Sequence, residues 1–100
     1  MHELYSLKKI AEDLLFPAQF EFRTEELRPD VFGSYYSVYE RRDEEIRFVW
    51  DGRDGWGFLE HRRQGEDNWT QIGDTILEGP LDAMKEHAIK EWEIALAKYL

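Results

Sequence analysis

Residues 45–62, EIRFVWDGRDGWGFLEHR, contain the pattern that decides the fold. In residues 45–50 an apolar side chain occupies every second position, which is the period of a half-buried β-strand. Residues 51–55 supply the glycines and aspartates that a tight connection requires, and the strand pattern resumes over residues 56–62. The stretch therefore predicts a β-hairpin.

Three further strands are expected around this hairpin. Phe20 and Phe22 alternate with charged residues, and residues 34–41 are rich in tyrosine and valine. Residues 69–73 follow another polar turn and are expected to form the last strand. Residues 25–33 are predicted to be a polar loop between the first two strands.

Helices are expected at both ends of the chain. Apolar residues recur at steps of three and four over residues 3–16, and Pro17 ends this helix because a proline ring cannot continue the hydrogen-bond ladder. A second apolar stripe runs over residues 81–99, after a Gly-Pro pair at residues 79–80 that suits the start of a helix.

This order of elements predicts a single α+β domain over residues 1–100. Strands joined by short turns pair with their neighbours in the chain, so we expect a five-stranded, mainly antiparallel meander sheet. The N-terminal and C-terminal helices are expected to pack on one face of it. Two helices cannot cover both faces, which leaves the other face uncovered.

The alternation also assigns side chains to the two faces. The residues expected to face the helices are Phe20, Phe22, Tyr36, Val38, Ile46, Phe48, Leu59 and Ile72. The residues expected on the uncovered face, and predicted to form an interface there, are Tyr35, Tyr39, Arg47, Trp56, Phe58 and Trp69. Tyrosine, tryptophan and arginine dominate interface energetics. A one-residue register error would move these rings into the core, and that alternative stays open.

The charge of the chain separates classes of partner. The formal net charge is −9, so binding to nucleic acid or to an anionic membrane is not expected, whereas a basic protein would be attracted. Residues 1–10 are polar and resemble no signal peptide, and no stretch is apolar and long enough to span a bilayer. Together with the absence of cysteine, these features lead us to expect a cytoplasmic protein.

Motifs for catalysis or for cofactor and metal binding are missing from the sequence. Residues 51–55 lack the further carboxylates of a calcium loop, and the three histidines are too scattered to suggest a metal site. No glycine-rich phosphate loop or nucleophile motif is present. The sequence predicts no cofactor, no metal and no catalytic residue, so an enzyme is the less favoured interpretation.

Two functional hypotheses remain. The first is a non-enzymatic protein-interaction domain that forms a homodimer or binds a basic protein partner, with an inhibitor or immunity-type role among the options. The alternative is a small-ligand-binding protein or enzyme with a pocket between sheet and helices. In that pocket His61 and Arg62 would supply the polar groups.

Overall fold

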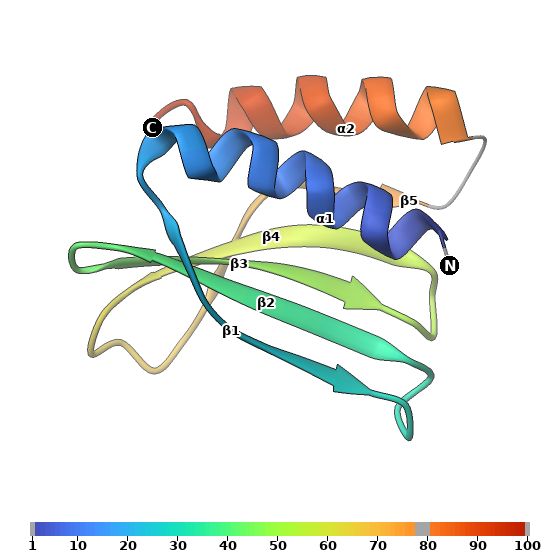
Figure 1. The fold of residues 1–100 in the computed structure, drawn as a ribbon, viewed down its shortest axis with the longest axis horizontal. Coiled ribbons are helices and arrows are strands. Elements are labelled where there is room, and N and C mark those ends of the chain that lie inside the picture. The colour runs from blue at the N-terminus through green and yellow to red at the C-terminus, as the bar shows by residue number, and fades with distance from the viewer. Residues whose placement is uncertain (1, 78–80, 100) are drawn as a thin grey trace.

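A computed structural model describes residues 2–77 and 81–99 of the chain, so the Gly-Pro pair at residues 79–80 lies outside the described residues. The elements follow in the order α1 (His2–Leu15), the short 3-10 helix η1 (Phe16–Ala18), β1 (Glu21–Arg28), β2 (Ser34–Arg41), β3 (Glu44–Asp51), β4 (Trp56–Arg63), β5 (Thr70–Leu77) and α2 (Leu81–Leu96) (Figure 1).

The five strands form one antiparallel meander in the order β1-β2-β3-β4-β5. Both helices lie on the same face of this sheet, and α2 packs on β5 and on α1 (Figure 1). The predicted α+β architecture is therefore confirmed. Neither described helix is long and apolar enough to cross a membrane.

Some element boundaries differ from the prediction. β1 continues to Arg28, although residues 25–33 were expected to be a loop, and β5 continues to Leu77. Every residue of β1 is exposed, and beyond Phe22 its residues 24–28 lack the alternation that marks a half-buried strand. The second helix ends at Leu96, where the Tyr99 amide donates a hydrogen bond to the Leu96 carbonyl oxygen at 2.8 Å.

The core fills the space between the sheet and the two helices. Its largest fully buried side chains include those of Phe48 and Trp92, whose ring centroids are 6.0 Å apart. Gly57 lets α1 approach closely, because a Cβ atom there would lie 2.8 Å from the Cδ1 atom of Leu7. The missing side chain at Gly57 thus leaves room for the end of the Leu7 side chain between helix and sheet.

The faces of β2 are the reverse of those predicted. Tyr35 and Tyr39 are buried beneath the helices, whereas Tyr36 and Val38 lie on the other face. The register shows this, since Tyr39 pairs with the core residue Ile46. Residues 34–41 contain aromatic side chains at adjacent positions and a serine in the middle of the buried face. The sequence pattern therefore fits either assignment of alternate residues to the two faces of the sheet.

Candidate functional site

The sheet face opposite the helices, here called the open face, is covered by no helix in the described part of the chain (Figure 1). It carries charged and aromatic side chains from strands β1 to β4 and from Trp69, the residue before β5. The members on which the site depends are Arg23, Tyr36, Glu45, Arg47, Phe58, Glu60, Arg62 and Trp69.

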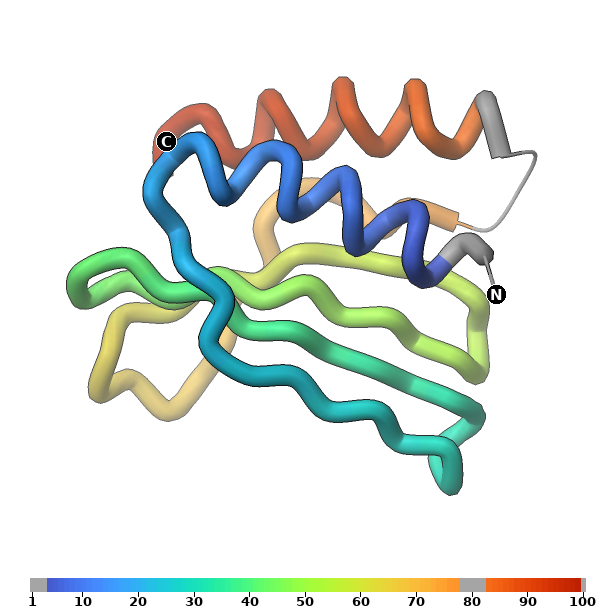
Figure 2. The backbone as a smooth tube through the Cα atoms, viewed as in Figure 1, coloured from blue at the N-terminus to red at the C-terminus, as the bar shows by residue number. Residues whose placement is uncertain are grey.

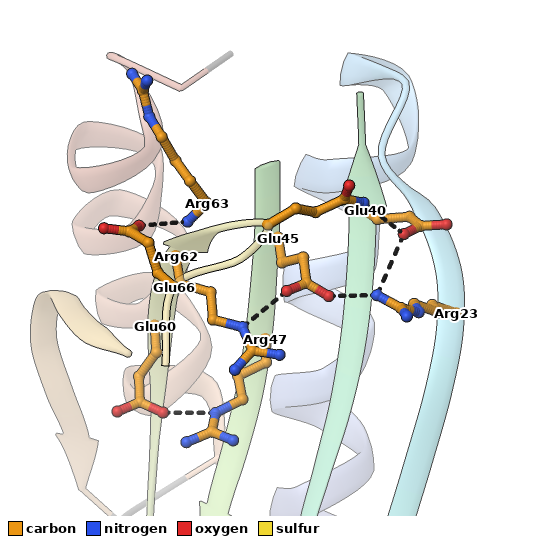
Figure 3. Close-up of polar contacts among 9 residues, drawn as sticks. Arg23, Glu40, Glu45, Arg47, Glu60, Arg62, Arg63 and Glu66 are labelled. Carbon is orange, nitrogen blue, oxygen red and sulfur yellow. Dashed lines mark hydrogen bonds and ion pairs between the residues drawn. The ribbon is translucent and has the colours of Figure 1, made fainter. Parts of the chain in front are cut away.

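Glu45 on β3 is the centre of this site. Although it lies on an uncovered face, the residue is only 2% exposed. Arg62 of β4 donates from Nε to Oε1 at 2.7 Å, and Arg23 of β1 donates from Nη1 to Oε2 at 2.5 Å (Figure 3). A buried carboxylate requires such partners, and here they come from both sides of its strand. The three residues thus form one preorganised unit across the sheet.

A second ion pair lies beside this unit. Arg47 donates from Nε to the Oε1 atom of Glu60 at 2.6 Å (Figure 3). Both pairs follow from the register of the hairpin, in which Glu45 lies opposite Arg62 and Arg47 lies opposite Glu60. Opposite charges facing each other across an antiparallel pair are favourable, so the hairpin itself builds the charge pattern.

Trp69 joins the two ion pairs. The guanidinium carbons of Arg47 and Arg62 both lie 4.3 Å from the centroid of its ring, and that of Arg47 lies 5.5 Å from the ring of Tyr36. These distances are typical of cation–π contacts. The group lines a shallow hollow of about 350 Å³, which also includes Val38. Its polar atoms are held in place by their neighbours, and parts of the rings remain accessible.

The structure separates the predicted interface residues into two groups. Arg47, Trp56, Phe58 and Trp69 lie on the open face or at its rim, as expected from the hairpin register. The prediction was wrong for the faces of Tyr35 and Tyr39, whose rings belong to the core. These two tyrosines are therefore not accessible to a partner at the open face.

Tyr35 and Tyr39 instead connect elements within the molecule. The Tyr39 hydroxyl donates to Glu12 of α1 at 2.6 Å, and the Tyr35 hydroxyl donates to Glu25 of β1 at 2.7 Å. Burial, followed by the hydrogen bond to Glu12, raises the pKa of the Tyr39 phenol above its usual range. The pKa of the Tyr35 phenol is raised for the same two reasons, with Glu25 as the acceptor.

His61 and Arg62 do not form one site. They are neighbours on β4 and point to opposite faces, with His61 beneath the helices and Arg62 on the open face. The His61 ring lies 4.4 Å from that of Tyr99, and its Nε2 atom is 3.6 Å from a carboxylate oxygen of Glu44, which is too far for a hydrogen bond. The polar groups expected in a pocket between sheet and helices thus lie apart.

Glu60 was expected on the uncovered face beside Arg47, and the register confirms that position. Glu45, Tyr36 and Arg23 were not identified from the sequence. Glu45 and Tyr36 could have been found by extending the hairpin register, which places them on the same face as Arg62 and Val49. Arg23 could not, because a β-bulge between Phe22 and Thr24 shifts the register of β1.

Among residues 4–77 and 83–99, whose side chains the structure describes, no three His, Asp or Glu side chains gather closely enough to hold a metal ion. Comparison with models of protein families, with curated proteins and with solved structures finds no significant match to this chain.

Proposed function

We propose that this chain is a non-enzymatic protein-interaction domain that binds a basic protein partner through the open face. The observation that carries the proposal is the stacking of Arg47 and Arg62 on Trp69 next to the buried Glu45. An inhibitor or immunity-type role, in which the partner is a cationic enzyme, fits the same arrangement.

The site has the properties of an interface hot spot. Tryptophan, tyrosine and arginine contribute most strongly when they sit in well-packed positions, and Trp69, Tyr36 and Arg47 are already in contact. Their side chains are held by ion pairs and stacking in the free protein. Binding would therefore require little additional ordering, which favours affinity.

The charge distribution favours a cationic partner. On the open face the three guanidinium groups are matched by three carboxylates: Arg62 pairs with Glu45, Arg23 with Glu45 and Glu40, and Arg47 with Glu60. The field at a distance is then set by the net charge of −9, which attracts a basic protein and repels a polyanion.

Affinity capture with matched variants tests this proposal. Wild-type protein, Trp69→Ala and the control Ile94→Glu, an exposed position on α2, are immobilised and exposed to an extract of the cells that naturally produce the protein. We expect a basic protein to be retained by the wild type and the control. Trp69→Ala should weaken this binding about thirtyfold, as expected for a hot-spot tryptophan.

Salt provides the second arm of the test. Moderate salt should slow association, because it screens the long-range attraction. Equal retention by Trp69→Ala and wild type, or a retained partner that is acidic, would contradict the proposal. Loss of binding in the Ile94→Glu control would place the contact on the helical side.

A further inference from the structure

The two edges of the sheet differ in how they are covered. At the β5 edge, the Asp74 amide donates to Oε1 of Glu91 on α2 at 3.2 Å, and a Cβ atom on Gly73 would lie 2.8 Å from the Cβ atom of Ala95. At the other edge all eight residues of β1 are exposed, and β1 lies at the side of the sheet farthest from α2 (Figure 2). The β1 edge is therefore the accessible one.

The bulge in β1 determines which of its side chains share a face. Arg23 has no partner position on β2, so the eight residues Glu21–Arg28 occupy seven positions along the ladder. Phe22, Glu25 and Leu27 lie on the helix-covered side, opposite Tyr39, Ser37 and Tyr35. The residues on the open side are Glu21, Arg23, Thr24, Glu26 and Arg28.

We propose that two copies of this chain pair through β1, antiparallel, about a two-fold axis at Glu25. The strand is then opposite itself, with Glu21 facing Arg28 of the second copy and Phe22 facing its Leu27. The bulge position, with Arg23, faces Glu26. Each of these pairs joins residues from the same side of the sheet, as an antiparallel ladder requires. The bulge makes this register possible, because it turns Phe22 to the same side of the sheet as Leu27.

The signs of the charges support self-pairing. Charged residues on an edge strand usually prevent association with other strands. Here both off-axis charged positions meet the opposite charge in the second copy, Glu21 with Arg28 and Arg23 with Glu26, so the opposite-charge contacts outnumber the single like-charge contact of Glu25 with its own copy on the axis. Within one chain Arg28 already pairs with Glu26, and Arg23 with Glu40 and Glu45, so these groups would be shared with the second copy. The remaining off-axis position joins Phe22 and Leu27, which are 46% and 55% exposed in the single chain. Pairing would remove both side chains from water.

This dimer would join two five-stranded sheets into one. A two-fold axis perpendicular to the sheet keeps both helical layers on one side and both open faces on the other. The dimer and the Trp69 hollow share Arg23, but the strand pairing does not involve Trp69, Arg47 or Arg62, so the dimer can fail while the proposed function stands. In the same way, Trp69→Ala should leave the dimer unchanged.

Charge exchange tests the pairing. Sedimentation equilibrium should show a concentration-dependent dimer for the wild type, and Arg28→Glu should weaken it about tenfold, because two like-charge contacts replace two opposite ones. The double variant Glu21→Arg with Arg28→Glu should restore dimerisation. A wild type that stays monomeric at about 1 mM, or a double variant as weak as the single one, would overturn the proposal.

Disulfide formation tests the register separately, because the chain has no cysteine of its own. Glu25→Cys brings two thiols to the axis, where directly opposite residues have Cβ atoms about 5 Å apart, close enough for a disulfide after small adjustments. In Arg28→Cys the two thiols would be roughly 20 Å apart along the ladder. We expect a covalent dimer from the first variant only. Cross-linking of Arg28→Cys alone, or of neither variant, would overturn the proposed register.

Discussion

On the helix-covered face Tyr39 is fully buried and its hydroxyl bonds to Glu12 of α1, whereas on the open face Trp69 is partly accessible and bears Arg47 and Arg62 on its ring. On the covered face the Tyr39 hydroxyl is thus bonded to the helical layer. On the open face Arg47 and Arg62 are bonded to carboxylates of the same sheet. We infer from this difference that the first face holds the fold together and the second is arranged for a contact outside the molecule.

The largest difference between the faces should appear when a tryptophan is removed from each. Trp92 is fully buried against Phe48, and its indole N–H has no hydrogen-bond partner among the described residues, so its contribution comes from packing. Trp92→Ala should lower the free energy of unfolding by about 3–5 kcal/mol. Trp69→Ala should lower it by less than about 1.5 kcal/mol. Urea denaturation measures both, and similar losses would remove the distinction.

The next largest effect is expected at Glu45. Its removal leaves Arg23 and Arg62 without their common carboxylate, but both guanidinium groups are partly exposed, which limits the cost. Glu45→Ala should lower the free energy of unfolding by about 1–3 kcal/mol. Glu93→Ala, at an exposed position on α2, serves as the control and should change it by less than about 0.5 kcal/mol.

A smaller effect, with a characteristic pH dependence, is expected at Tyr39. Tyr39→Phe removes the hydrogen bond to Glu12 and should cost about 1 kcal/mol. The pKa of Tyr39 is raised in the folded protein, so the unfolded chain loses this proton first as pH rises. The protonated Tyr39 hydroxyl therefore contributes fully to the free energy of unfolding below about pH 10, and this contribution is lost as the pH rises further.

Thermal melts between pH 8 and pH 11 check the sign. The wild type should lose stability above about pH 10 more steeply than Tyr39→Phe does. Tyr35, whose pKa is also raised, should leave part of the decline in the variant. Identical slopes would show that Tyr39 does not ionise on unfolding in the way its burial implies.

The sequence predicts the hairpin side of the molecule better than the β1 side. Strands β3 and β4 alternate clearly around residues 51–55, so their faces and the position of Arg47 follow from the pattern. In β2 the buried face contains Ser37 between Tyr35 and Tyr39, and Tyr36 lies on the other face. The sequence alone therefore does not show which set of alternate residues is buried.

For β1 the limits are of another kind. No side chain of this strand is buried, so hydrophobic alternation could not show where it ends. The β-bulge at Arg23 changes the face of the residues before it relative to those after it. The contact between Arg23 and Glu45 joins residues 22 positions apart and depends on that bulge. Such a contact arises from the folded sheet and has no local signal in the sequence.

The most direct test of the central claim is to identify which face touches a partner in the cell. A photoreactive phenylalanine analogue replaces Phe58 on the open face in one variant and the exposed Ile94 on α2 in another. Irradiation of the cells that naturally produce the protein should give a cross-link to a basic protein from position 58 and none from position 94. Cross-links from position 94 alone, or equally from both positions, would contradict the account.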